Sequence, residues 1–157
     1  MLCHQVETCA GEIVRDGAAE HRQTIHSVSD LMRLLETVST AMMKAGHPDK
    51  DLFRVRLALE EAVVNANKHG HQGDWSQPII VSYHVSAGGV TAEVEDQGPG
   101  FNLAQVPDPL APENLEKSSG RGLFLMRNYM TNVCHNEWGN RICLCKHRLA
   151  NERGPSP

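Results

Sequence analysis

The order of apolar patterns along the chain restricts its fold more than any single motif does. Two stretches in the first half carry apolar residues at the three- and four-residue spacing of amphipathic helices. Two β-rich runs around Ser86-Ala-Gly-Gly89 then indicate a hairpin. In chain order, the expected elements are a short strand at 12–15, a helix from a cap at Ser27 or Ser29 to about Ala45, a helix from about Asp49 to His69, strands at 79–85 and 90–95, a helix at 123–131, and strands at 133–138 and 141–147.

Helices and hairpins in this order come in blocks instead of alternating one by one. Such a pattern predicts an α+β fold in the form of a two-layer sandwich. A chain of 157 residues has the right length for one domain with a real hydrophobic core. We expect that domain to span 12–149, with tails at 1–11 and 150–157.

Charge and hydropathy exclude several classes of function. The formal net charge is −4 at pH 7 and no basic patch stands out, so nucleic acid is not an expected partner. No apolar run approaches the ~20 residues that cross a bilayer, and residues 1–12 lack the pattern of a signal peptide. We therefore expect a cytoplasmic protein without membrane contact, whose five cysteines are free thiols.

A carboxylate and an amide lie one turn apart on the second predicted helix. Glu61, Asn65 and His69 are spaced by four residues, so they share one face, roughly 100° from the centre of the apolar stripe. The amide oxygen can ligate magnesium while water and phosphate oxygens take the other positions, and the carboxylate can orient a nucleophile or take its proton. A solvated helix face is the alternative interpretation of these residues alone.

A glycine-rich bend follows the second strand of the predicted hairpin. Asp96 ends that strand and is followed by Gly98 and Gly100, which allow sharp turns and a close approach to a ligand. The Asp96 carboxylate can accept a hydrogen bond from an exocyclic amine such as that of adenine. An ordinary turn is the alternative, because Asp and Gly are common turn residues.

A second glycine-containing loop precedes the third predicted helix. Backbone N–H groups of Gly120-Arg-Gly122 at a helix start form a site for an anion, and Lys117, Ser118, Ser119 and Arg121 add donors beside it. A flexible loop joined to a capped helix is the alternative. Residues 97–119 contain four prolines and no sustained period, which is typical of a functional lid. The chain has no G-x-x-x-x-G-K-[ST] motif, which excludes a P-loop enzyme.

Together these motifs resemble the ATP-binding superfamily of gyrase, histidine kinases and MutL, known as the GHKL or Bergerat fold. Within it, the chain is similar to the small anti-sigma factor serine-protein kinases of bacterial partner-switching systems. Segment 61–70 matches the N box of that family, 94–101 its first glycine box and 119–126 its second, and the resemblance covers about 12–149. It implies a mixed, mostly antiparallel sheet covered on one face by about three helices, with 97–119 as the ATP lid.

The resemblance also implies a role for each motif residue. Glu61 would be the catalytic base, Asn65 the magnesium ligand, and Asp96 the acceptor for the adenine amine. Two positions depart from the family: Gly139-Asn140 replaces the usual Gly-Thr, and Ser118 stands where better-known members can carry Arg. The residues implied to bind the cofactors, ATP and Mg2+, are Asn65, Asp96, Gly98, Gly100, Lys117, Ser119, Gly120, Arg121, Gly122, Leu123 and Asn140.

The activity implied by the resemblance is transfer of the γ-phosphoryl group of ATP to a serine or threonine of a small anti-anti-sigma protein of the STAS type. A sigma factor would be a second partner, and the apolar first helix could supply part of a homodimer interface. Two alternatives stay open. One is a nucleotide-dependent binding module without phosphotransfer. The other is a detached ATP-binding half of a histidine kinase. That class of protein needs a phospho-accepting histidine on a dimerising hairpin, whereas the first predicted helix is a single one and His26 lies outside it.

Overall fold

The structure is a computed structural model that describes residues 20–99 and 121–148. The strand expected at 12–15, both tails and nearly all of the expected lid lie outside these ranges. In chain order, the described elements are β1 (His21–Ile25), α2 (Val28–Lys44), α3 (Asp49–Asn65), the π-helical turn η1 (Ala66–Gly70), β2 (Ile79–Ser86), β3 (Gly89–Glu95), α4 (Arg121–Tyr129), β4 (Asn132–His135) and β5 (Arg141–His147).

Helix α2 begins where a serine and an aspartate satisfy its first backbone amides. Ser27 is the N-cap, and its Oγ accepts a hydrogen bond of 3.1 Å from the backbone N–H of Asp30. The Asp30 carboxylate accepts one of 2.9 Å from the backbone N–H of His26, an arrangement close to a capping box. Gly46 has a φ of 83° and provides the left-handed residue that ends the helix. Of the two predicted caps, Ser27 is therefore the one that the fold uses.

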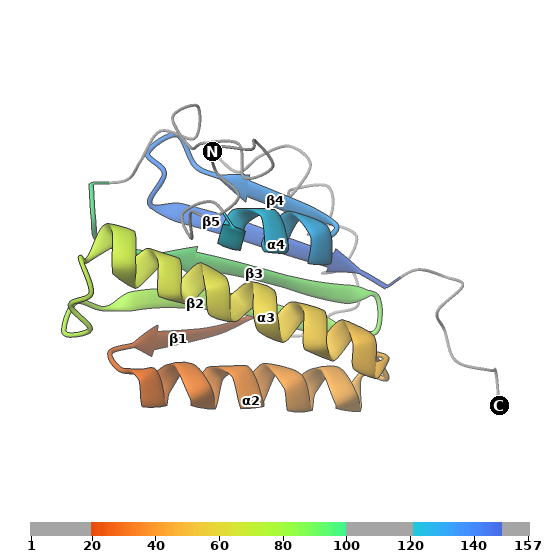
Figure 1. Cartoon of the computed structure of the whole chain (residues 1–157). Coiled ribbons are helices and arrows are strands. Elements are labelled where there is room, and N and C mark those ends of the chain that lie inside the picture. The colour runs from red at the N-terminus through yellow and green to blue at the C-terminus, as the bar shows by residue number, and fades with distance from the viewer. Residues whose placement is uncertain (1–19, 100–120, 149–157) are drawn as a thin grey trace, which may run out of the picture.

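The strands form one antiparallel sheet in the order β1-β2-β3-β5-β4. The predicted hairpin is confirmed, because Ser86 of β2 pairs with Gly89 of β3 around a two-residue turn. Helices α2, α3 and α4 lie side by side across one face of the sheet (Figure 1). The predicted two-layer α+β sandwich, with helices on one face, is thus confirmed.

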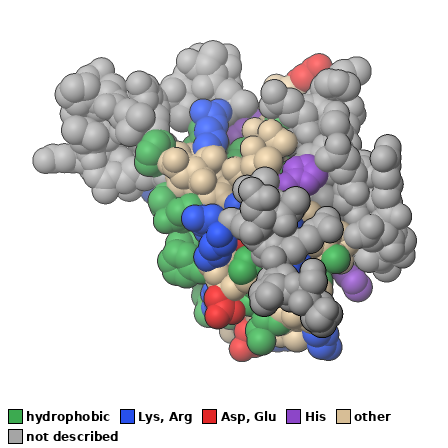
Figure 2. Space-filling view, turned by 90° about the vertical axis from the view of Figure 1, so that its right-hand side faces the viewer, with side chains coloured by type: hydrophobic (Ala, Val, Ile, Leu, Met, Phe, Trp, Pro, Cys, Tyr) green, Lys and Arg blue, Asp and Glu red, His purple; other side chains and the backbone are tan. Residues whose placement is uncertain are grey.

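The hydrophobic core lies between the two layers. Alternate residues of the strands, such as Val81 on β2 and Leu144 on β5, point to the same side as the helices, while Leu34, Leu59 and Met126 reach them from α2, α3 and α4. Basic, acidic and apolar side chains are interspersed on the face shown in Figure 2. Among the described residues, no helix is long and apolar enough to cross a membrane.

The first strand was not predicted from the sequence. β1 is an outer strand of the sheet, and of its five residues only Ile25 is buried. Its composition is polar, so it shows no alternating apolar pattern. Strand β1 exists because it pairs along its whole length with β2, from His21 opposite Tyr83 to Ile25 opposite Ile79.

The cysteines of the last hairpin differ in their bonding. Cys143 is a buried free thiol, as expected, and burial raises its pKa to about 12. Cys134 and Cys145 each take part in a disulfide. The expectation of free thiols is therefore wrong for these two residues.

Candidate functional site

The predicted carboxylate and amide of α3 lie directly against the start of α4. Glu61 and Asn65 are half-buried one helical turn apart. A Cβ placed on Gly122 would lie 2.5 Å from Oε2 of Glu61 and 2.8 Å from Nδ2 of Asn65. A side chain at this position would displace the ends of the Glu61 and Asn65 side chains. The N-terminal turn of α4, whose first backbone N–H groups can bind an anion, is thereby placed beside a carboxylate and an amide.

The second predicted helix does not stay α-helical to His69. Its last predicted turn is the π-helical η1, which ends at Gly70. The carbonyl oxygen of Asn67 accepts hydrogen bonds of 3.0 Å from the backbone N–H groups of His71 and Gly73. With its side-chain amide oriented to match its neighbours, Asn67 also donates to the carbonyl oxygen of Asp74 at 3.2 Å. This buried asparagine therefore anchors the π-helical turn and the loop after it. Single π-helical turns are often found at functional sites.

The π-helical turn brings Gly70 against the glycine-rich bend that follows β3. A Cβ on Gly70 would collide with the carboxyl group of Asp96, and a Cβ on Gly98 would collide with the backbone carbonyl of Gly70. Both glycines are thus required by close packing, since neither has a positive φ. The end of the N-box segment and the start of the first glycine box form one continuous structure.

Asp96 is held by hydrogen bonds on its main chain and its side chain. Its backbone N–H donates to the carbonyl oxygen of Asn140 at 2.9 Å, and its own carbonyl oxygen accepts from Nδ2 of Asn140 at 3.3 Å. Its Oδ1 accepts from the N–H of Gly98 at 2.8 Å. Among the described residues, none donates to Oδ2. Within the described residues, Oδ2 of Asp96 is therefore left to accept a bond from a ligand.

Burial is the main influence on the charge of Asp96. The side chain is 7 % exposed, and this desolvation raises the pKa of its carboxyl group, against the lowering effects of the Gly98 N–H and of nearby His71. A buried carboxylate that lacks a direct cationic partner is unfavourable for folding. It is suited to a ligand that brings a hydrogen-bond donor.

The structure gathers the described site residues into two adjoining groups. Glu61, Asn65 and Gly122 form one group, and η1 connects it to a second group that contains Asp96, Gly98 and Asn140. Four other predicted residues, namely Gly100, Lys117, Ser119 and Gly120, lie outside the described residues.

The structure also gives the positions of three further residues named from the sequence. Arg121 is the first residue of α4. Leu123 is partly buried and packs against the core. His69 shares the Glu61/Asn65 face in the sequence pattern but is exposed at the end of η1.

Sequence reasoning missed one buried residue of this region. His71 accepts a hydrogen bond of 2.9 Å at Nε2 from the backbone N–H of Gln97, which directly follows Asp96. A single histidine in a polar loop gives no sequence signal of such a role. Only the fold shows that the loop after α3 and the bend after β3 lie together.

Comparison with known proteins agrees with this geometry. The model of the histidine kinase-like ATPase domain family matches residues 25–146, which is most of the chain. The chain therefore belongs to the histidine kinase-like ATPase domain family, and an ATPase domain implies a site for ATP. The resemblance to the GHKL superfamily is confirmed.

The chain is also similar to curated bacterial proteins. Each is named Anti-sigma F factor, and three come from Bacillus thuringiensis (strain Al Hakam), Bacillus mycoides (strain KBAB4) and Bacillus cereus (strain AH187). Each is 28% identical over 116 residues, which cover 71% of this chain and 80% of the relative.

Proposed function

We propose that this protein is an ATP-dependent serine/threonine-protein kinase that acts as an anti-sigma factor in a bacterial partner-switching system. Its substrate is a STAS-type anti-anti-sigma protein, and a sigma factor is its second partner. The observation that carries the proposal is the contact of Gly122 with both Glu61 and Asn65. This contact brings a carboxylate, an amide and the start of a helix together, which supports the roles of general base, metal ligand and phosphate site that we assign to them. The names of the similar proteins support the choice of partners.

ATP binds with its adenine at Asp96 and its phosphates toward α4. In this proposal Oδ2 of Asp96 accepts the exocyclic amine, and the close contact of Gly98 with Gly70 shapes the wall beside it. Asn140 holds the main chain of Asp96 from the β4–β5 turn, so its role is to orient that carboxylate. Gly100, Lys117, Ser119, Gly120 and Arg121 complete the phosphate loop in this proposal.

The donor set at Asn65 fits a magnesium ion, because a neutral amide oxygen beside a carboxylate leaves the remaining positions to water and phosphate. When bound, the ion neutralises charge on the phosphate oxygens. Glu61 takes the proton of the attacking serine or threonine hydroxyl as that oxygen bonds to the γ-phosphorus. The bond from the γ-phosphorus to the bridging oxygen breaks, and ADP leaves with the electron pair.

Phosphoryl transfer tests the proposal directly. The chain is incubated with γ-labelled ATP, Mg2+ and a candidate anti-anti-sigma protein encoded beside it. Label is expected on a serine or threonine of that protein, and Glu61→Gln should reduce the rate at least about 100-fold, as loss of a general base does. ATP affinity should change by less than about threefold, since Glu61 is assigned no contact that the glutamine cannot replace.

Two results separate the alternatives. Label that stays on ATP with every candidate, in a protein that binds ATP normally, would contradict the kinase. If the partner is nevertheless held or released according to the nucleotide, the protein is a binding module. Glu60→Gln, one position away and half-buried on α3, is the matched control and should retain full transfer.

A further inference from the structure

His71 is a buried histidine that has no part in the roles proposed above. It follows η1 directly, and 3 % of it is exposed. Its Nε2 accepts the hydrogen bond from the backbone N–H of Gln97. An imidazole nitrogen accepts such a bond only when it carries no proton. The contact therefore requires a neutral ring whose proton is on Nδ1.

Three consecutive backbone N–H groups at the bend have three different acceptors. Asp96 donates to the carbonyl oxygen of Asn140 at 2.9 Å, Gln97 to Nε2 of His71 at 2.9 Å, and Gly98 to the Asp96 carboxylate at 2.8 Å. His71 is the acceptor that comes from the α3 side of the site. Its bond ties the bend after β3 to the loop after η1, and so fixes the direction of the Asp96 side chain.

We propose that His71 is a positioning residue of the nucleotide site, which holds the 96–98 bend in its adenine-binding form when neutral and releases it when protonated. An imidazolium ion has two donors and no acceptor. The Gln97 N–H would then face another N–H at hydrogen-bonding distance, and the two groups must separate. This inference rests on the proposed function, in which the 96–98 bend binds adenine.

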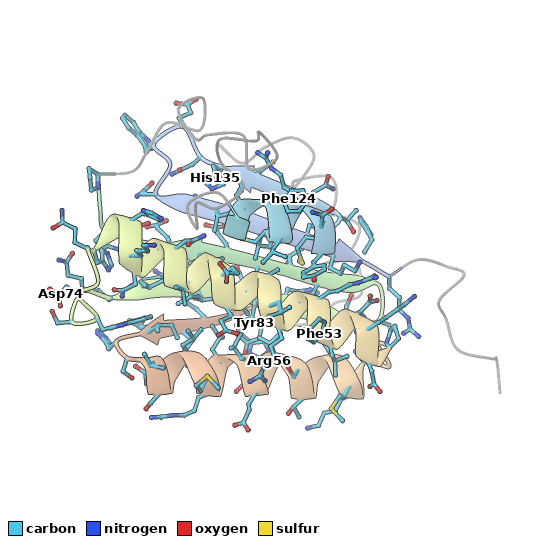
Figure 3. The ribbon with its side chains drawn as sticks, viewed as in Figure 1. Phe53, Arg56, Asp74, Tyr83, Phe124 and His135 are labelled. Atoms are coloured by element: carbon cyan, nitrogen blue, oxygen red, sulfur yellow. The ribbon has the colours of Figure 1, made fainter. Side chains whose placement is uncertain are left out.

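Two carboxylates interact electrostatically with His71. They are Asp96 on the bend and Asp74 on the loop between η1 and β2, where Figure 3 labels it. Protonation of the ring would remove the acceptor of the Gln97 N–H, so adenine affinity would depend on the protonation of a residue that does not touch the nucleotide.

The tautomer of the ring is the first test, and it needs no nucleotide. Two-dimensional 15N NMR of the imidazole groups at pH 8 should show His71 with its proton on Nδ1 and a bare Nε2. A merely structural histidine that donates from Nε2 would show the opposite tautomer, and that result would overturn the proposal.

Calorimetric titration with Mg-ADP at pH 8 and pH 6 is the second test. Between these values, the affinity of the wild type should fall about 3- to 10-fold more than that of His71→Gln, the effect of one hydrogen bond. A glutamine Oε1 can replace Nε2 as the acceptor and does not titrate. His71→Ala should weaken binding about 3- to 10-fold already at pH 8. His26→Gln, at an exposed position, is the control and should behave as the wild type.

The outcomes distinguish this inference from the proposed function. A wild type that binds neither ADP nor ATP at millimolar concentration contradicts both. A wild type that binds, while His71→Gln keeps the whole pH dependence, contradicts only the role of His71. If His71→Ala does not fold by circular dichroism, the tautomer and His71→Gln still decide the question.

Discussion

At the scale of single residues, the binding role proposed for Asp96 opposes stability. Its carboxylate is buried and bonded to the Gly98 N–H, while no cationic side chain among the described residues pairs with it directly. Burial therefore raises the pKa of Asp96. The ionised form is less favourable in the folded protein than in the unfolded chain, and a bound adenine amine would compensate for this.

Replacement of this carboxylate should have opposite effects on binding and on stability. Asp96→Asn should weaken ATP binding by roughly 10- to 100-fold in calorimetric titration, because a charge-assisted bond is lost. The variant should also raise the Tm of the free protein at pH 7. The amide oxygen still accepts from the Gly98 N–H, and the buried charge is gone.

The pH dependence of that stability difference follows from the direction of the pKa shift. The folded-state pKa of Asp96 lies above its ordinary value of 3.8, so the wild type loses stability relative to the variant as pH rises from that value through the raised pKa. Scanning calorimetry should therefore give equal Tm values below about pH 3.8 and a gap that widens toward pH 7. Asp49→Asn, at the exposed far end of α3, is the control. Unchanged ATP affinity in Asp96→Asn would mean that the adenine pocket is elsewhere.

At the scale of elements, the site depends on how closely α4 approaches α3. Gly122 sits in the first turn of α4, where a side chain would fill the space between Glu61 and Asn65. At the other end of the site, the π-helical turn η1 brings Gly70 so close to Asp96 that a side chain at position 70 would meet the carboxyl group. The close approach of glycines to side chains and backbone of the neighbouring motif therefore joins the three motifs.

Gly122→Ala tests this contact. Alanine in a helix is favoured over glycine by about 1 kcal/mol, so an open position would become more stable. Because the added methyl group would lie 2.5 Å from Oε2 of Glu61, that side chain and Asn65 must move, and we expect a loss of phosphoryl transfer of at least about tenfold from their displacement. Asn128→Ala, exposed on the same helix, should leave transfer unchanged. A fully active Gly122→Ala would show that α4 lies farther from Glu61 and Asn65.

At the scale of the whole molecule, one core holds the helical layer on the sheet. α3 lies between α2 and α4 across the sheet (Figure 1), so its buried face contributes to packing on both sides. The rim of the same helix that carries the candidate site residues Glu61 and Asn65 is half-buried. Loss of core packing under α3 should therefore affect the fold before it affects the chemistry.

Truncation of a core residue on α3 checks this expectation. Leu59 is 1 % exposed, and Leu59→Ala should lower the free energy of unfolding by about 2–5 kcal/mol in urea denaturation, a large part of the ~5–15 kcal/mol of a typical domain. Val64→Ala, at a position that is 37 % exposed, should change it by less than about 0.5–1 kcal/mol. Equal losses in the two variants would contradict the two-layer core.

Local chemistry alone determined the helices, the hairpins and the identity of the motif residues. Apolar spacing of 3.6 residues, the Ser27 cap and the turn at Ser86–Gly89 act over a few residues, so they can be recognised in the sequence. The Asp96 bend and the Glu61/Asn65 face were recognisable for the same reason. Their contacts with Gly70 and Gly122 were not, because those depend on how separate elements pack.

The tertiary structure alone decided three other features. β1 is a strand because β2 offers it a hydrogen-bonding edge, although its own sequence is polar. The last turn of the second predicted helix widens into η1 because the buried Asn67 holds the loop after it. His71 accepts its hydrogen bond from Gln97, 26 residues away in the chain, and no local sequence pattern predicts that contact. Contacts between distant segments arise only when the sheet and helices close on a common core.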